Sequence, residues 1–158
     1  MRAHITPFLL FNKEAGEAAN YYVSVFKGKL LEVKKYPEGT PMPAGTVLTA
    51  SFEILGMTIT ALNWGQEAKY SETISFAIEP DTQEEVDYYW NALTANGGQE
   101  GPCGWCKDKY GVSWQVAPEA LPRLMNDPNP KKSSAVMQAM MKMKKIIIKD
   151  IQAAYDKA

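Results

Sequence analysis

Residues 18–26, AANYYVSVF, point to the fold because part of this stretch recurs later in the chain. Asn20-Tyr21-Tyr22 has a similar counterpart in Asp87-Tyr88-Tyr89, 67 residues further on. Each tripeptide lies within apolar residues at helical spacing, and each helical pattern has strand patterns before and after it. The sequence therefore predicts two copies of one unit, each with the order β-α-β-β-β.

The first copy is expected over about residues 4–64. The apolar run Ile5–Phe11 predicts a strand, and a helix follows that ends at Gly28. Three more strands are expected at Leu30–Tyr36, Thr46–Ile54 and Met57–Asn63. The short turn Leu55-Gly56 joins the last two strands.

The second copy is expected over about residues 70–117. A strand at Thr73–Glu79 precedes a helix in which Asp81 and Glu84 have capping-box spacing. The apolar stripe of this helix consists of Val86, Tyr89, Trp90 and Leu93. The helix stops near Asn96-Gly97-Gly98. Strands are expected from Gln99 onward, at Cys103–Lys107 and at Val112–Ala117.

A helical tail, residues 118–158, follows within the same single domain, 1–158. Asp127-Pro128-Asn129-Pro130 is a break, and one or two helices are expected over Ser133–Lys157. Their apolar face is expected to hold Val136, Met137, Met140 and Met141. The β-branched run Ile146-Ile147-Ile148 predicts a kink or break.

Composition excludes several classes of partner. The 158 residues carry 17 basic and 18 acidic side chains, a formal net charge of −1, which predicts neither nucleic-acid nor membrane binding. Six lysines cluster in the tail, and we interpret them as a solvated helix face. The early apolar run is too short for a signal peptide, and two cysteines make no disulfide framework. We expect a cytoplasmic protein.

Both cysteines lie in residues 101–111, GPCGWCKDKYG. A redox Cys-x-x-Cys stands at a helix N-terminus, whereas a turn and the alternating strand Val112–Val116 follow here, which indicates a hairpin. If Lys107 pairs with Val112, Cys106 shares a face with Ser113 and Gln115. A one-residue change of register would reverse this assignment.

This hairpin, the first helix and the tail resemble the PhnB-like branch of the vicinal oxygen chelate superfamily, from about residue 4 to 156. The matching segments are Pro7–Leu9, Ala18–Tyr22, Val25-Phe26, Cys103–Trp105, Lys107–Gln115 and Val136–Ile146. The resemblance implies an α+β fold in which two βαβββ half-barrels enclose a cavity. It also implies a homodimer.

In metal-dependent relatives, the resemblance implies four ligands from the first and last strands of both units. Here those positions offer Thr6 or Pro7, Asn63 and Gln115, which are weak ligands or none. The only histidine, His4, precedes the first strand, and we interpret it as structural or solvent-exposed. We expect no metal and no cofactor.

The branch is often labelled 3-demethylubiquinone-9 3-methyltransferase. Conventional methyl transfer needs a glycine-rich turn between a strand and a helix, and the chain has neither GxGxxG nor GxGxG. The label is therefore retained only as part of an alternative interpretation.

The predicted function is binding of a small organic ligand in a mainly apolar cavity. The candidate residues are Phe8, Asn63, Trp64, Trp105, Cys106, Ser113 and Gln115. They could equally be packing residues without a ligand. The alternative is an enzyme acting on a small organic substrate, of glyoxalase, dioxygenase or nominal methyltransferase type. A thiol redox protein is a third, weaker hypothesis.

Overall fold

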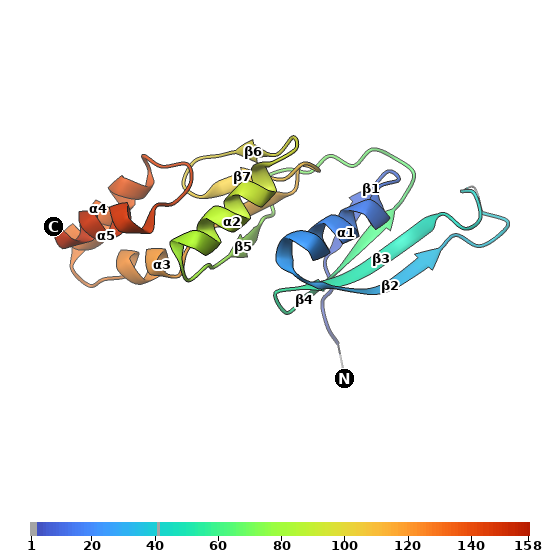
Figure 1. Cartoon of the computed structure of the whole chain (residues 1–158), viewed down its shortest axis with the longest axis horizontal. Helices are drawn as coiled ribbons and strands as arrows, with labels where there is room; N and C mark the ends of the chain where they lie inside the picture. Colours follow the sequence, from blue (N-terminus) through green and yellow to red (C-terminus); the bar gives the residue numbers. More distant parts are fainter. Residues whose placement is uncertain (1–2, 41) are drawn as a thin grey trace. The chain divides into compact units, whose positions relative to one another are not determined.

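The structure, a computed structural model, describes residues 3–40 and 42–158. The chain divides into two compact units, Met1–Lys69 and Tyr70–Ala158. Both units have the order β-α-β-β-β, and three further helices follow in the second (Figure 1). The predicted α+β fold with two βαβββ units is confirmed.

The first unit is a mixed sheet with the strand order β1-β4-β3-β2, in which β1 runs parallel to β4. Its elements are β1 Phe8–Phe11, α1 Ala15–Phe26, β2 Lys29–Lys35, β3 Val47–Ile54 and β4 Met57–Asn63. The predicted first strand begins three residues too early, since Ile5 is 96% exposed and outside the sheet. The turn Leu55-Gly56 is confirmed, with the positive φ values of 45° and 79° that tight hairpins need.

Small residues let α1 lie close to this sheet. Ala15, Ala18 and Ala19 are fully buried, and the ring of Tyr22 stacks on Phe52 at 5.6 Å. The helix ends at Phe26, and two residues later a β-carbon on Gly28 would stand 2.2 Å from the carbonyl oxygen of Glu53. Only glycine permits this approach of backbone to strand.

The second unit is a mixed sheet with the order β5-β8-β7-β6, in which β5 runs parallel to β8. Its elements are β5 Phe76–Ile78, α2 Gln83–Thr94, β6 Gln99–Glu100, β7 Trp105–Lys107, β8 Ser113–Val116, α3 Ala120–Met125, α4 Pro130–Met140 and α5 Ile148–Asp156. The strand predicted at Thr73–Glu79 is reduced to three residues.

The capping box of α2 is one residue later than predicted. Thr82 accepts a hydrogen bond from the Glu85 amide, and the Glu85 carboxylate accepts one from the amide of Thr82. Asp81 and Glu84 do not form the box, because the helix begins at Gln83.

The shared burial pattern of the two helices defines the repeat. The buried residues of α2 are Val86, Trp90 and Leu93, and each lies 68 residues after a buried residue of α1, namely Ala18, Tyr22 and Val25. The tyrosine pairs that suggested the repeat are 67 residues apart, one position out of phase. Trp90 therefore takes the place of Tyr22, and Tyr89 is only half-buried.

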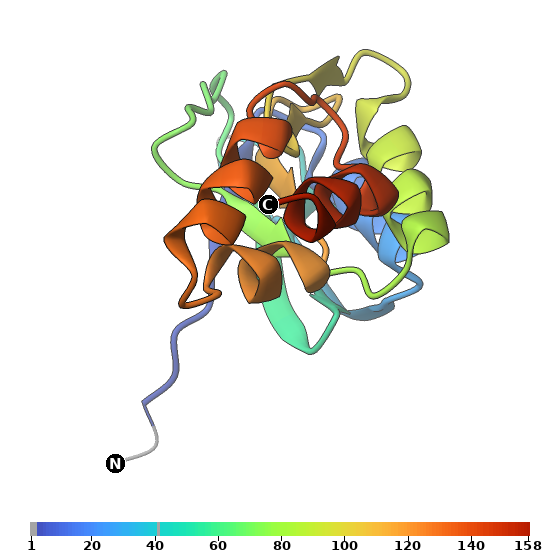
Figure 2. The same ribbon diagram turned by 90° about the vertical axis from the view of Figure 1, so that its left-hand side faces the viewer.

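Helices α3, α4 and α5 pack together in the second unit (Figure 2). Their core consists of Leu121, Leu124, Val136, Ile146 and Ile151. The sequence did not predict α3, but it predicted the break before α5, which the structure places at residues 141–147. The expected methionine face is wrong in part, since Met137 is 46% and Met141 67% exposed. None of the described helices is long and apolar enough to cross a membrane.

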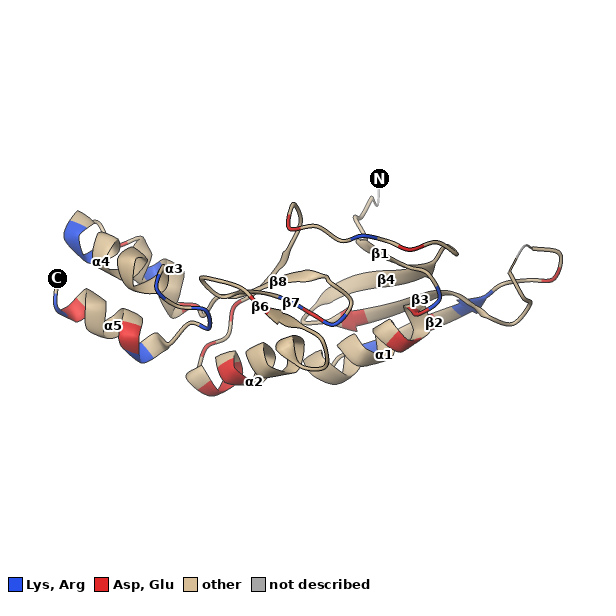
Figure 3. Ribbon diagram, turned by 90° about the horizontal axis from the view of Figure 1, so that it is seen from above, with Lys and Arg blue, Asp and Glu red and all other residues tan. Residues whose placement is uncertain are grey.

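The segment between α4 and α5 holds the β6–β7 hairpin. The amides of Cys103 and Gly104 donate to the carbonyl oxygens of Met143 and Lys144 at 2.8 and 2.7 Å. Lys144 also pairs with Glu100 at 3.2 Å. Lys145 similarly pairs with Asp87 on α2 at 2.7 Å. The prediction that these two lysines belong to a solvated helix face is wrong, because both lie between helices. Along the tail helices themselves, basic and acidic residues are interspersed (Figure 3).

Candidate ligand cavity

The register of the β7–β8 hairpin decides which side chains share a face. Lys107 pairs with Ser113, Cys106 with Trp114 and Trp105 with Gln115. The register considered from the sequence, with Lys107 opposite Val112, is one residue off. Cys106 therefore shares the face of Trp114, while Trp105 and Lys107 share the face of Ser113 and Gln115.

The buried carboxylate of Asp108 sets this register. Its Oδ1 accepts hydrogen bonds from the amides of Tyr110 and Val112, and its Oδ2 accepts one from the Trp114 indole at 2.8 Å. Three donors compensate the burial of a side chain that is only 2% exposed. The hairpin turn is thus closed by a side chain in addition to its backbone.

The two cysteines form no disulfide. Cys106 lies in β7 rather than at a helix N-terminus, and burial, with a smaller effect of Asp108, raises the pKa of its thiol to about 12. A thiol of this kind is not a nucleophile at neutral pH. The geometry does not support the redox hypothesis.

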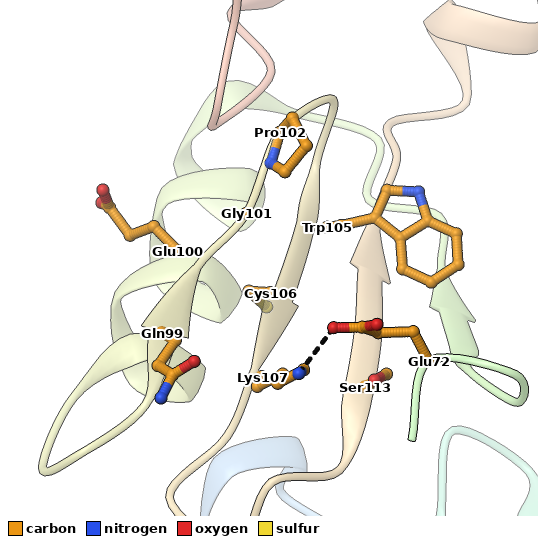
Figure 4. Close-up of a pocket in the computed structure, with 9 residues that line it drawn as sticks. All are labelled: Glu72, Gln99, Glu100, Gly101, Pro102, Trp105, Cys106, Lys107 and Ser113. Carbon is orange, nitrogen blue, oxygen red and sulfur yellow. Dashed lines mark ion pairs between the residues drawn. The ribbon is translucent and has the colours of Figure 1, made fainter. Parts of the chain in front are cut away.

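A cavity of about 490 Å³ lies in the second unit and includes the face of β7 and β8 that carries Lys107 and Ser113. The opposite face carries Glu100, which accepts a hydrogen bond from the Trp90 indole of α2. The lining residues are shown in Figure 4; they are Glu72, Gln99, Glu100, Gly101, Pro102, Trp105, Cys106, Lys107 and Ser113.

The loop before β5 reaches this face at two points. The carboxylate of Glu72 lies 2.6 Å from Lys107 Nζ (Figure 4), and this hydrogen bond, with the lysine charge, lowers the pKa of Glu72. The Gln115 amide donates to Ser75 Oγ at 2.8 Å. On the sheet face opposite α2, Lys107 is therefore bound by Glu72, and Gln115 is bound by Ser75.

The hydroxyl of Ser113 is the exception. Ser113 is 2% exposed, and within the described part of the chain its Oγ is a buried polar atom without a hydrogen-bond partner. A buried, unsatisfied polar group costs about 1–3 kcal/mol. An unsatisfied hydroxyl in a cavity lining is the kind of group a ligand would satisfy.

The predicted site residues are distributed over both units. Trp105, Cys106 and Ser113 belong to the lining, although Cys106 shares the face of Trp114. Gln115 pairs with Trp105 but is not a lining residue. The other three belong to the first unit, where Phe8 and Trp64 are 53% and 47% exposed and Asn63 is buried.

The sequence interpretation missed the other lining residues, namely Glu72, Gln99, Glu100, Gly101, Pro102 and Lys107. The one available signal was the position of Lys107 in the hairpin, which requires the correct register. Glu72 stands on an irregular loop, and no pattern in the sequence connects it with the hairpin.

Asn63 has a structural role in the first unit. Its Oδ1 accepts from the Ala15 amide at 2.8 Å, and its Nδ2 donates to the carbonyl oxygens of Lys13 and Val47. It caps α1, whose N-cap residue Glu14 makes no side-chain capping bond. A second hollow, about 640 Å³, includes Asn63, whose amide is already satisfied.

The donor set does not fit a divalent metal. The Oδ1 atom of Asn63 already accepts a hydrogen bond from the Ala15 amide, and an amide oxygen such as that of Gln115 is not among the usual ligands of a divalent metal site. Over residues 3–40 and 42–158, no three His, Cys, Asp or Glu side chains gather as a metal site. His4 is exposed.

A nucleotide methyl donor fits no better. The strand-to-helix connections, residues 12–14 and 79–82, have the sequences NKE and EPDT and contain no glycine. Phosphate cradles at this position use glycine so that the backbone can approach the ligand.

Comparisons with known proteins agree with this architecture. The family described as 3-demethylubiquinone-9 3-methyltransferase matches residues 3–117, so residues 118–158 lie outside that match. No curated protein matches the chain.

Three of the solved structures that are similar to this chain illustrate the match. A PhnB protein from Bacillus cereus is 30% identical over 73% of this chain and 98% of its own, with a TM-score of 0.64. Protein PA1353 from Pseudomonas aeruginosa is 23% identical over 74% and 98%, with a TM-score of 0.61. The fosfomycin resistance protein FosX from Listeria monocytogenes, in complex with Mn(II) and sulfate, is 17% identical over 72% and 89%, with a TM-score of 0.51. The last two show the fold alone.

Proposed function

The chain belongs to the protein family described as 3-demethylubiquinone-9 3-methyltransferase, within the vicinal oxygen chelate superfamily. From this premise, we propose that it binds a small organic molecule in the cavity of its second unit without a bound metal. The observation that carries the proposal is the buried hydroxyl of Ser113, which has no partner in the described structure and belongs to the cavity lining. Trp105 and Pro102 also belong to the lining and supply apolar surface.

The size and composition of the cavity support this function. A volume of about 490 Å³ lies within the range of small-molecule sites. Such sites combine apolar walls with a few polar groups that orient the ligand. Methyl transfer is not proposed, because neither strand-to-helix connection can cradle a nucleotide.

Native mass spectrometry of the purified full chain tests the proposal, and a library of small organic molecules screened by thermal shift supplements it. We expect a bound molecule or library ligand that raises the melting temperature. Gln99→Trp, on the same face as Lys107, should fill the cavity and abolish binding. Thr58→Trp is the matched control, because Thr58 is an exposed strand residue of the first unit that faces away from α1.

Two results would contradict the proposal. Equal binding by the Gln99→Trp and Thr58→Trp variants would place the ligand elsewhere. A divalent metal at one equivalent per chain, required for ligand binding, would contradict the metal-free part and favour an enzyme on a small organic substrate.

We also propose that the chain forms a homodimer. Exposed apolar side chains on β2 and at the β3–β4 turn support this assembly; they are Leu30, Leu31, Val33, Leu55 and Met57. Light scattering after size exclusion should give twice the chain mass of 17.6 kDa. Substitution of Leu31 and Leu55 by lysine should shift the mass to that of one chain, and an unchanged monomeric mass in the parent protein would refute the dimer.

A further inference from the structure

We propose that the cavity ligand is a small organic acid, whose carboxylate binds between Lys107 Nζ and Ser113 Oγ in the place now partly taken by the Glu72 carboxylate. This inference rests on the proposed function, because it requires a ligand in the same cavity. It adds the chemical class of the ligand and the groups that recognise it.

The two members of the Lys107–Glu72 ion pair differ in exposure and in secondary structure. Lys107 lies on β7, between the β6 and β8 strands that pair with it, and its side chain is 32% exposed. Glu72 lies in the irregular loop before β5, and its side chain is 68% exposed. Because the carboxylate is the more exposed member, it is the one that a ligand would displace into solvent. The charged group that then remains at this point of the lining is the Lys107 ammonium, which is positive.

Lys107 is the only cation among the described residues that line the cavity. The other lining carboxylate, Glu100, is held by the Trp90 indole at 3.1 Å and by Lys144 at 3.2 Å. Its strand position pairs it with Cys106, on the face opposite Lys107. Glu100 therefore does not compete for the ammonium.

Ser113 supplies a second donor beside the first. Ser113 and Lys107 are directly paired across the β7–β8 hairpin, so their side chains leave the sheet on the same face. Glu72 reaches Lys107 but makes no hydrogen bond with Ser113 Oγ, which has no partner in the described structure. The internal carboxylate satisfies one half of a two-donor site, and a ligand carboxylate with two free oxygens can satisfy both halves.

Trp105 indicates the chemical nature of the part of the ligand beyond its carboxylate. It lies two residues from Lys107 along β7, on the same face, and belongs to the cavity lining. An indole presents a flat apolar surface suited to an aromatic or planar group. The geometry therefore favours an acid with an aromatic body over a small aliphatic acid.

Matched pairs of probes test the charge requirement. We would titrate the full chain with benzoate, phenylacetate and 3-phenylpropionate, each against its uncharged primary amide, by isothermal calorimetry. The ammonium should make at least one acid bind about tenfold or more tightly than its amide. Acetate should bind more weakly than the aromatic acids.

Variants identify the groups responsible. Lys107→Met should remove the preference for the acid, whereas Lys109→Met is the matched control, since Lys109 lies over the Tyr110 ring outside the cavity lining. Glu72→Gln should raise affinity for the acid about two- to fivefold, because it removes a competing carboxylate from an exposed ion pair. Ser113→Ala should weaken the acid more than the amide.

The outcomes separate this inference from the proposed function. Amides that bind in the cavity as tightly as their acids would overturn the acid inference and leave the proposed function intact. Weaker acid binding by the Glu72→Gln variant would also overturn it, because Glu72 would then be part of the receptor. If no probe binds and no molecule co-purifies, both proposals fail. Thermal melts of each variant would show that it is folded.

Discussion

Each unit carries small hydroxyl side chains on the sheet face opposite its helix, and the two units satisfy them differently. In the first unit, Ser51 and Thr60 are paired across β3 and β4, and their hydroxyls hydrogen-bond to each other at 2.9 Å. In the second unit, Ser113 is paired with Lys107, whose ammonium turns to Glu72 and leaves the serine unsatisfied. The equivalent sheet faces of the two units thus differ in whether their buried hydroxyl groups have hydrogen-bond partners.

This difference separates a structural role from a functional one. A pair of hydroxyls that satisfy each other needs nothing from outside the protein. A buried hydroxyl without a partner carries a free-energy cost, and proteins retain such groups mainly where a ligand, water or ion removes it. The first unit therefore serves as a reference for the second, since its hydroxyl groups on the same sheet face are satisfied by hydrogen bonds within the protein.

The largest expected difference concerns the final hairpins of the two units. Asp108→Ala removes the carboxylate that accepts three hydrogen bonds and should cost about 3–5 kcal/mol of unfolding free energy. In the first unit, the β3–β4 turn depends on Gly56 at φ 79°, so Gly56→Ala should cost only about 1–2 kcal/mol. Urea denaturation of both variants checks the order, and equal losses would show that the Asp108 network adds nothing to the turn.

The cap of α1 should give the next effect. Asn63→Ala removes three hydrogen bonds, leaving the Ala15 amide and two carbonyl oxygens without their partner, and should cost about 2–3 kcal/mol. Asn63→Asp keeps the acceptor but turns both donor contacts into repulsions, so it should not rescue stability. Thr82→Ala, which breaks the capping box of α2, should cost about 1 kcal/mol. A full rescue by Asn63→Asp would refute the role of the amide donors.

Loss of the serine hydroxyl should change the stability with opposite signs in the two units. Ser51→Ala leaves the buried Thr60 hydroxyl without its partner and should destabilise the protein by about 1 kcal/mol. Ser113→Ala removes an unsatisfied hydroxyl and should leave the ligand-free protein unchanged or more stable by up to about 1 kcal/mol. Destabilisation by Ser113→Ala in the ligand-free protein would show that the hydroxyl has a partner in solution.

The cysteines should give the smallest effect on stability at neutral pH. At pH 8, a thiol reagent should modify Cys103 in the folded protein and reach Cys106 only after unfolding, as counted by mass spectrometry. Burial, with a smaller contribution from Asp108, raises the pKa of Cys106 from 9.0 to about 12, so its stabilising effect is complete below pH 9 and is lost as the pH rises towards 12. Cys106→Ala should flatten this alkaline part of the stability curve, and rapid labelling of both thiols at pH 8 would contradict the burial.

The sequence predicted the order of the elements because periodicity and glycine punctuation are local signals. Met57–Asn63 and Ala15–Phe26 lie where alternation and helical spacing placed them. Register is not local, because it depends on how Asp108 closes a turn with donors from three other residues. A slip of one residue was enough to move Cys106 from one face of the hairpin to the other.

The candidate site was harder to predict for the same reason. Trp105 and Ser113 were named from the hairpin alone, since both lie in a recognisable motif. Glu72 belongs to a loop 35 residues before its partner Lys107, and Asn63 looked like a site residue although the helix N-terminus needs its amide. Pairing at such distances in the sequence is decided by packing, which a single sequence does not display.

The segment between α4 and α5 also sets when the second unit can fold during synthesis. The two backbone hydrogen bonds that hold the β6–β7 hairpin connect residues 40 positions apart, Cys103 with Met143 and Gly104 with Lys144. At about 5–20 residues per second, the ribosome adds this later segment roughly 2–8 s after the hairpin. During synthesis, the hairpin that carries Trp105 and Lys107 therefore lacks these two hydrogen bonds until residues 143 and 144 have been added.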